Sequence, residues 1–246
     1  MTNSLQWLRS VIFVVLLYLA LFLLAVGFAI PALIWKRSSF IWMKLFSQWA
    51  RFSAKHIVGL HTEVRGTVPT GAVLVASKHQ SWLDSIALLS VLDAPRFIMK
   101  KELTWIPILG WHGLNNGFIP VDRGKRGQAI AKLMDDVKAG QAKPGQLIIY
   151  PQGTRVAPGV KMPYKMGTAA LYSQLQQDCI PVATNVGVFW PRRGLYRRPG
   201  TAVIEFLPAI KPGLSNAEFM RELETRIETA STRLMAEART TPPKGA

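Results

Sequence analysis

The sequence predicts an α/β fold with a largely parallel sheet flanked by helices, preceded by an N-terminal hydrophobic, membrane-associating helical segment. After residue 60, short β-branched runs alternate with longer helical patterns, an order typical of parallel strands joined by helices. Before residue 60 lies an apolar run of the length that a bilayer requires. We therefore divide the chain into membrane-anchoring helices over residues 1–58 and a globular domain over residues 59–246.

The composition limits the class of protein. Of the 246 residues, 49% are hydrophobic and 18% are charged, which excludes intrinsic disorder. Cys179 is the single cysteine, so an intrachain disulfide is impossible. The net charge of +16 favours an anionic partner, which could be nucleic acid, a membrane surface or a phosphorylated substrate. Because the C-terminal part from Glu205 onward is neutral, the excess charge does not form a basic tail of the kind that binds nucleic acid.

The N-terminal segment has the properties of a membrane helix. Val11 to Trp35 contains no charged residue, and a helix over Val11–Ile30 would span about 30 Å, the thickness of the hydrocarbon core. Pro31 is expected to break or kink this helix. No small-residue cleavage motif follows the run, so a signal peptide is disfavoured. A buried helix of a soluble protein is the remaining alternative.

A second N-terminal helix is predicted over Lys36–Lys55, where basic residues alternate with aromatic ones such as Trp42 and Phe46. This pattern suits a membrane surface with anionic lipids. Only Arg9 precedes the apolar run, whereas several basic residues follow it. The positive-inside rule therefore places the following domain on the cytoplasmic face of an inner or cytoplasmic membrane. A monotopic hairpin would leave it there too, and the sequence does not decide between spanning and monotopic insertion.

The globular part consists of alternating strands and helices. Strands are predicted at Ala72–Ser77, Arg96–Met99, Gly117–Val121, Gln146–Tyr150, Ile180–Val188 and Thr201–Phe206. Helices are predicted at Trp82–Leu92, Gly127–Ala139, Gly167–Gln177 and Asn216–Ala238. Ser215 and Glu218 have the spacing of a capping box that opens the last helix.

The segment Lys78-His79-Gln80-Ser81-Trp82-Leu83-Asp84 could hold a catalytic base. Histidine is the side chain that ionises near neutral pH, and a nearby carboxylate fixes its tautomer. His79 and Asp84 can meet only if His79 lies in the loop before the helix and Ser81 caps its first turn. The alternative is that Ser81 and Asp84 form an ordinary capping box and that His79 is a solvated loop residue.

Three further segments follow predicted strands, where ligands of parallel sheets gather. In Tyr150-Pro151-Gln152-Gly153-Thr154-Arg155, Gly153 could free backbone N–H groups for an oxyanion and Arg155 could bind phosphate. In Gly117-Phe118-Ile119-Pro120-Val121-Asp122-Arg123, Arg123 could face the same crevice. A tight surface turn and an Asp122–Arg123 ion pair are the respective alternatives. Ile180-Pro181-Val182-Ala183 can only shape a pocket or pack the core.

Other chemical signals are missing from the sequence. It contains no Gly-x-Ser-x-Gly elbow, Walker loop, cysteine cluster or histidine pair at metal spacing. We therefore expect no metal and no resident cofactor. His56, His61 and His112 are isolated and are expected to be structural or exposed, and Cys179 is expected to be a core residue.

Taken together and in this order, the four segments resemble the glycerophospholipid acyltransferase family. That family has blocks of the form NHxSxxD, GxxFIDR, FPEGTRS and VPV, which here are KHQSWLD, GFIPVDR, YPQGTRV and IPVA. The resemblance extends over about residues 60–210 and makes residues 59–246 an acyltransferase domain. It implies transfer of an acyl chain from acyl-CoA or acyl carrier protein to lysophosphatidic acid, which gives phosphatidic acid.

The resemblance also implies site residues. His79 would be the catalytic base and Asp84 its partner, while Arg123, Gly153, Thr154, Arg155 and Lys165 would bind substrate, with arginines assigned to the acceptor phosphate. Gln152 stands where the family usually has Glu, and Val156 where Ser is usual. The first departure leaves another lysolipid open as acceptor. A non-enzymatic membrane-anchored basic protein is the competing class, but it does not explain the His79 and Asp84 constellation.

Overall fold

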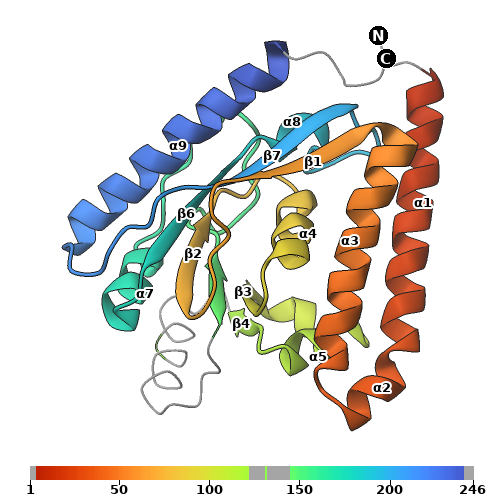
Figure 1. Ribbon diagram of the computed structural model, residues 1–246, viewed down its shortest axis with the longest axis horizontal. Coiled ribbons are helices and arrows are strands. Elements are labelled where there is room, and N and C mark those ends of the chain that lie inside the picture. Colours follow the sequence, from red (N-terminus) through yellow and green to blue (C-terminus); the bar gives the residue numbers. More distant parts are fainter. Residues whose placement is uncertain (1–3, 122–130, 132–144, 241–246) are drawn as a thin grey trace.

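The computed structural model describes residues 4–121, 131 and 145–240, and within this part seven strands form one sheet (Figure 1). The strands are β1 (Leu60–Arg65), β2 (Val73–Ser77), β3 (Pro95–Lys100), β4 (Ile119–Val121), β5 (Gln146–Ile149), β6 (Cys179–Thr184) and β7 (Gly200–Phe206). Their order is β1-β7-β6-β2-β5-β3-β4. The five strands from β6 to β4 are parallel, whereas β7 is antiparallel to β6 and parallel to β1. The prediction of a largely parallel sheet is therefore confirmed.

Helices cover both faces of this sheet (Figure 1). On one face α4 (Trp82–Val91) packs between the sheet and α3 (Ser38–Val58), and α1 (Ser4–Gly27) lies against α3 at the edge of the molecule. On the other face lie α7 (Gly167–Leu175) and α9 (Asn216–Thr240). The shorter helices are α2 (Ala29–Ile34), η1 (Lys101–Trp105), α5 (Leu109–Asn115) and α8 (Val186–Phe189).

The central strands are buried on both faces, and their side chains alternate between two cores. Val75 and Ile148 belong to the core under α4, whereas Leu74 and Leu147 belong to the core under α7 and α9. This alternation is the two-residue period of a strand. Because β2 and β5 are parallel and in register, the segments that follow them emerge side by side at one edge of the sheet.

The N-terminal helices share the core of the globular part. Phe13 of α1 and Trp42 of α3 are almost completely buried and belong to the same hydrophobic cluster as Ile86 of α4. The boundary predicted after residue 58 falls between α3 and β1, yet the packing continues across it. The division into an anchor and a catalytic domain stays a prediction. Removal of residues 1–58 would uncover the apolar face of α4.

The first helix is long and apolar enough to cross a membrane, a criterion of length and composition, and 28% of its most apolar window is buried. Its outward side chains include Trp7 and Phe22, which are 49% and 62% exposed. The helix is interrupted after Gly27, and α2 begins at Ala29. Pro31 causes this break, because it lacks the N–H group that would donate to the carbonyl of Gly27.

The fold differs from the sequence prediction at β1 and after β6. β1 was not predicted, because His61, Glu63 and Arg65 give this edge strand a polar sequence. The strand predicted over Ile180–Val188 ends at Thr184 and is followed by α8. There the hydroxyl of Thr184 accepts from the N–H of Val186, at 3.1 Å, and turns the chain. The predicted helix over Gly127–Ala139 falls, except for residue 131, outside the described residues.

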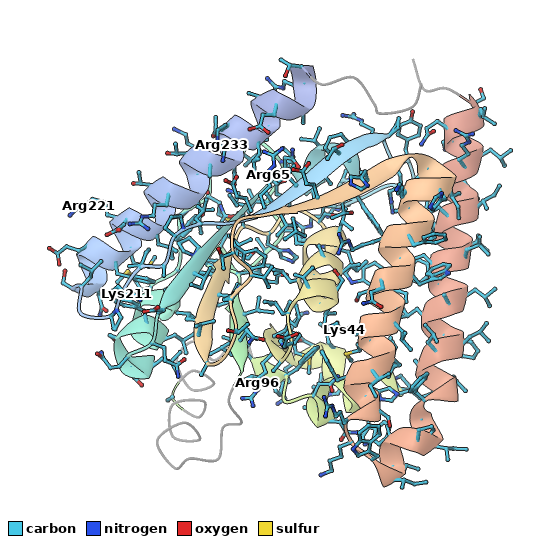
Figure 2. All side chains as sticks on the ribbon, in the orientation of Figure 1. Lys44, Arg65, Arg96, Lys211, Arg221 and Arg233 are labelled. Carbon is cyan, nitrogen blue, oxygen red and sulfur yellow. The ribbon has the colours of Figure 1, made fainter. Side chains whose placement is uncertain are left out.

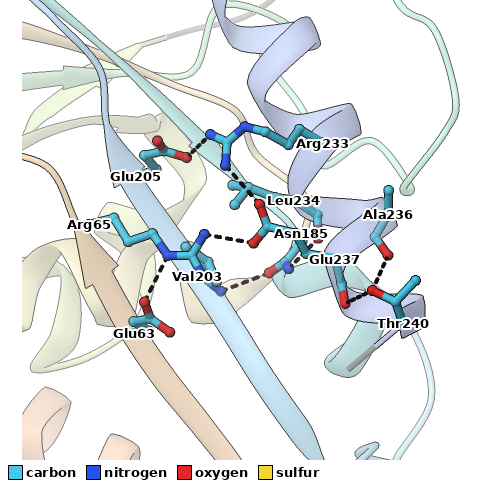
Figure 3. A network of polar contacts seen from close by, with 10 residues as sticks. All are labelled: Glu63, Arg65, Asn185, Val203, Glu205, Arg233, Leu234, Ala236, Glu237 and Thr240. Atoms are coloured by element: carbon cyan, nitrogen blue, oxygen red, sulfur yellow. Dashed lines mark hydrogen bonds and ion pairs between the residues drawn. The ribbon is translucent and has the colours of Figure 1, made fainter. Parts of the chain in front are cut away.

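A polar network fastens α9 to the strands at the β1 edge (Figure 3). Arg65 donates to Glu63 and to Glu237 of α9, both at 2.7 Å, and Arg233 of α9 pairs with Glu205 of β7 at 2.5 Å. Since these side chains are partly exposed, each pair contributes modestly, and together they fix the position of α9. α9 also begins at the predicted capping box, in which Ser215 and Glu218 bond to each other.

Candidate active site

His79 and Asp84 meet at the carboxyl end of β2. Ser81 is the N-cap of α4, and its side chain accepts from the N–H of Leu83 at 3.2 Å. Oδ2 of Asp84 accepts from the backbone N–H groups of Gln80 and Ser81, both at 2.7 Å, and lies 3.0 Å from Nδ1 of His79. The sequence analysis treated the capping box and the His–Asp contact as alternatives. In the structure the carboxylate of Asp84 makes both.

This contact determines which imidazole nitrogen is free. Asp84 is fully buried, and an ionised carboxylate can only accept hydrogen bonds. Nδ1 of His79 therefore carries the proton, and Nε2 presents its lone pair. The side chain of His79 is 16% exposed, and no partner holds Nε2 within the described part of the chain. The arrangement supplies an oriented base that a substrate can reach.

Tyr150, the residue after β5, covers one face of the imidazole. Its ring stacks on that of His79 with a centroid distance of 3.8 Å and an interplanar angle of 15°. Its hydroxyl lies 2.7 Å from Oγ of Ser85 in the first turn of α4. Burial raises the pKa of the Tyr150 phenol, and the negative charge of Asp84 adds to this effect. Tyr150 is therefore a neutral ring held between β5 and α4.

The loop after Tyr150 contacts residues 78–81, the segment between β2 and α4 that holds His79 and is called the histidine loop here. The N–H of Val156 donates to the carbonyl of His79 at 2.8 Å, so the first and third sequence blocks are joined through their backbones. Gly153 has φ +69°, and its own N–H donates to the carbonyl of Tyr150 at 2.8 Å. The N–H of Gly153 itself closes the turn, so the backbone N–H groups that could bind an oxyanion are those of the residues that follow it.

The absence of a side chain at Gly153 leaves space for the ammonium group of Lys165. A Cβ at Gly153 would lie 2.6 Å from Nζ of Lys165, so the lysine side chain passes over the glycine. Thr154 and Arg155 are half-buried on the same loop. Within the described residues, their amide N–H groups bond to no other group and are free for a ligand. Gly153, Thr154, Arg155 and Lys165 therefore lie together beside His79.

Comparisons with known proteins identify the family of this chain. A family model described as Acyltransferase matches residues 61–185, which contain all four sequence blocks. The chain belongs to the Acyltransferase family. It is therefore an enzyme, and the alternative of a non-enzymatic basic anchor is set aside.

Several relatives of this acyltransferase have similar sequences. A Pseudomonas aeruginosa protein named 1-acyl-sn-glycerol-3-phosphate acyltransferase is 27% identical over 241 residues, covering 96% of this chain and 93% of the relative. A mouse protein named 1-acyl-sn-glycerol-3-phosphate acyltransferase alpha is 30% identical over 163 residues, covering 64% of this chain and 57% of the relative.

The fold is also found in a solved structure. The crystal structure of the 1-acyl-sn-glycerophosphate (LPA) acyltransferase PlsC from Thermotoga maritima superposes with a TM-score of 0.78 at 17% identity. The superposition covers 97% of this chain and 100% of that protein. The similarity includes the N-terminal helices as well as the sheet, and so confirms the predicted fold class.

One predicted site residue of the acyltransferase, Arg123, lies outside the described residues. It follows β4, which is separated from β2 by β5 and β3. Since β4 and β2 are parallel to the strands between them, their carboxyl ends point to the same edge of the sheet. That Arg123 and Arg155 converge there stays a prediction.

The sequence analysis missed an ion pair that joins the histidine loop to α9. Lys78 is 3% exposed, and its Nζ lies 2.5 Å from Oε1 of Glu228 on α9. The hydroxyl of Tyr164 donates to the same oxygen at 2.8 Å. Burial raises the pKa of Tyr164, and Glu228 adds to the effect. No local sequence signal could have found this contact, because Glu228 lies far along the chain.

Two residues set aside in the sequence analysis are structural, as expected. Cys179 is fully buried, and desolvation raises the pKa of its thiol, so it is not a nucleophile. His112 is fully buried, with Nδ1 2.8 Å from the hydroxyl of Ser39 and Nε2 3.1 Å from the carbonyl of Ala25. It joins α5 to α3 and α1. Among the described residues, no three His, Cys, Asp or Glu side chains gather as metal ligands.

Proposed function

We propose that this enzyme transfers an acyl chain from a thioester, of CoA or of acyl carrier protein, to the free hydroxyl of lysophosphatidic acid. The product is phosphatidic acid, an intermediate of phospholipid biosynthesis. The observation that carries the proposal is the His79–Asp84 pair, with Nε2 free beside a loop that presents Arg155 and Lys165. The names of the similar proteins support the same acceptor.

The proposed reaction uses His79 as general base. Nε2 accepts the proton of the acceptor hydroxyl while that oxygen attacks the thioester carbonyl carbon. The tetrahedral anion collapses, the carbon–sulfur bond breaks, and the leaving thiolate takes the proton from the imidazolium. The products are an ester and a free thiol. Asp84 keeps Nδ1 protonated and stabilises the imidazolium that forms transiently.

Two other parts of the site bind negative charge. The free N–H groups of Thr154 and Arg155 are the donors that we assign to the developing oxyanion. The guanidinium of Arg155 and the ammonium of Lys165 are assigned to the acceptor phosphate, together with Arg123. These steps need no metal and no resident cofactor, since the acyl donor brings its own activated carbonyl.

We propose that the N-terminal helices rest in one leaflet of the cytoplasmic membrane, with the catalytic part on the cytoplasmic face. α1 contacts the globular part at its start, its middle and its end. Gln6 donates to the carbonyl of Arg197 at 2.9 Å, the ring of Tyr18 stacks on that of Trp82 with 6.0 Å between centroids, and the carbonyl of Ala25 lies 3.1 Å from Nε2 of His112. If α1 crossed the bilayer perpendicular to the membrane plane, the polar groups that contact it would enter the hydrocarbon core, at a large cost in free energy. If the axis of α1 lies along the membrane plane, these groups stay outside the core.

Gln152, which stands where the family usually has Glu, raises a second candidate, an acyltransferase that acts on another lysolipid such as a lyso-amino-lipid. Its side chain is 2% exposed, and its Nε2 donates to the carbonyl of Met162 at 3.1 Å. A glutamate here would add a negative charge close to Arg155. The neutral amide removes that charge and leaves the loop more cationic, which also suits a doubly charged phosphate. We therefore favour lysophosphatidic acid.

A panel of acceptors tests the proposal. Purified full-length enzyme in detergent is given one acyl-CoA or acyl carrier protein thioester and one lysolipid at a time, and both thiol release and the acylated product are measured. We expect lysophosphatidic acid to give the highest kcat/KM. Preference for an acceptor without a phosphate monoester would contradict the assignment of Arg155 and support the second candidate.

A further inference from the structure

The segment between α8 and β7, residues 191–199, contains four arginines and is called the arginine loop here. Arg192, Arg193 and Arg198 are exposed, and within the described part of the chain no acidic side chain pairs with them. Between them lies Leu195, which is 48% exposed. The proposed catalytic steps use none of these side chains. An unpaired cationic loop with an exposed apolar tip suits a partner that is both anionic and apolar.

The fourth arginine gives the loop its shape. Arg197 is 6% exposed, its guanidinium lies 4.5 Å from the ring centroid of Trp190, and its Nη1 donates to the carbonyl of Gly194 at 2.9 Å. The loop is therefore folded around a buried cation. Its exposed arginines are consequently displayed from a defined surface and not from a loose segment.

The arginine loop is fastened to α1. The carbonyl of Arg197 accepts from Nε2 of Gln6 at 2.9 Å, and its N–H donates to the hydroxyl of Ser10 at 2.9 Å. Phe13 meets the edge of Trp190 at 5.4 Å. On its other side, the first half of α1 exposes an apolar face made of Leu5, Trp7, Leu8, Ile12 and Val15. The loop that carries the unpaired arginines is thus bonded, through Arg197, to the helix that we place in the membrane.

We infer that the arginine loop binds the phosphate groups of anionic phospholipids at the membrane surface on which α1 lies. Arginine forms bidentate contacts with phosphate, and basic residues beside an apolar face are typical of interfacial segments. An acidic carrier protein would suit the charge, but it would not explain Leu195 or the attachment to α1. The inference rests on the proposed membrane association and is independent of the acyl-transfer chemistry.

The location of this surface connects the membrane to the active site. Nη1 of Arg192 donates to the carbonyl of Arg155 at 3.1 Å, and Trp190 meets Trp82 at the start of α4 at 6.3 Å. Anionic headgroups bound at the arginine loop would therefore lie next to the loop that we assign to the acceptor phosphate. An acceptor arriving from the same leaflet would reach His79 without leaving the membrane surface.

A binding experiment without turnover tests the inference. Full-length protein in a neutral detergent is titrated with dihexanoyl phosphatidylglycerol, and dihexanoyl phosphatidylcholine is the neutral comparison. R193Q/R198Q removes two exposed arginines that lie outside the catalytic machinery. K211Q/R221Q removes the same charge on the far side of the molecule, where Figure 2 shows both residues near α7 and α9 and away from α1. We expect R193Q/R198Q to weaken binding about tenfold or more, since each arginine near an anionic lipid surface contributes about fivefold, and K211Q/R221Q to leave it unchanged.

Three outcomes would overturn the inference. One is an R193Q/R198Q variant that binds phosphatidylglycerol as well as the wild type. The second is an equal loss in K211Q/R221Q, which would mean that net charge alone is responsible. The third comes from steady-state kinetics of R193Q/R198Q: unchanged binding of phosphatidylglycerol with a raised KM for an acyl carrier protein thioester would make the loop a carrier-protein surface. The R155K variant should bind phosphatidylglycerol as the wild type does. The binding experiment therefore tests the arginine loop separately from the assignment of Arg155 to the acceptor phosphate.

Discussion

The imidazole ring of His79 lies flat against the ring of Tyr150, with 3.8 Å between centroids and 15° between planes. The hydroxyl of Tyr150 bonds to Ser85, the neighbour of Asp84, and Asp84 in turn holds Nδ1 of His79. The carboxylate of Asp84 therefore limits rotation of the imidazole within its plane, and the ring of Tyr150 packs against its face and limits tilting. Of its two nitrogens, Nε2 is the one left for substrate.

The first prediction concerns the stack. Replacing Tyr150 by Leu removes the ring that covers the imidazole, so kcat should fall about ten- to a hundredfold, the effect of a misplaced catalytic group. Both KM values should stay nearly constant. Tyr150→Phe is the matched control, because it keeps the ring and loses only the bond to Ser85. Equal turnover of the Leu and Phe variants would deny the stack any role in positioning the base.

The second prediction separates the two tasks of Asp84. Asp84→Asn should lower kcat by about 10²- to 10⁴-fold, because a neutral amide neither fixes the tautomer nor stabilises the imidazolium. Ser81→Ala removes only the cap and should cost about 0.5–2 kcal/mol of unfolding free energy with turnover largely kept. Steady-state kinetics and denaturant unfolding of both variants give the comparison. If the two variants lost turnover equally, the effect would come from the helix start and not from His79.

The third prediction concerns Arg155. Arg155→Lys keeps the charge and removes the planar fork, so the KM for lysophosphatidic acid should rise about ten- to a hundredfold. The KM for the acyl donor should stay nearly unchanged. Arg221→Lys on the exposed surface of α9 is the control and should behave as the wild type. An Arg155→Lys variant impaired toward the donor alone would reverse the assignment of the two binding sites.

The fourth prediction is a pH dependence of stability. Desolvation lowers the pKa of His112 from its ordinary value of 6.5, although the bond to the carbonyl of Ala25 partly opposes the shift. The folded protein therefore holds His112 neutral where the unfolded chain begins to bind a proton. By linkage, its contribution to stability is complete above about pH 6.5 and is lost as the pH falls below that value.

Thermal unfolding of the detergent-solubilised enzyme between about pH 7.5 and pH 5 measures this effect. His112→Gln can keep a hydrogen bond to Ser39 or Ala25 but cannot titrate, so its melting temperature should depend less on pH than that of the wild type. Identical slopes for the two proteins would show that other groups dominate the acid destabilisation.

The sequence predicted those elements of the fold whose formation depends mainly on residues close together in the chain. The apolar run, the basic aromatic helix and the capping boxes at Ser81 and Ser215 follow from neighbouring residues, and the structure contains them. Ser81 as N-cap was enough to bring His79 to Asp84. β1 was missed, because its pairing with β7 depends on residues far along the chain.

The predicted site was incomplete for the same reason. Tyr150 was visible as the residue before Pro151, but its stack on His79 depends on the register of β5 beside β2. The contact of Lys78 with Glu228 joins residues from opposite ends of the domain. The sequence also did not show which N–H groups near Gly153 are free, because the turn to Tyr150 uses the N–H of Gly153 itself.

The most direct test of His79 as the general base is thiol release from the acyl donor by the His79→Ala variant in the presence of lysophosphatidic acid. Turnover should fall by about 10² to 10⁴, the usual contribution of a positioned base. The melting temperature should stay close to that of the wild type, because the cap of α4 by Ser81 and Asp84 is retained. A correctly folded His79→Ala enzyme with near wild-type turnover would contradict the proposed mechanism.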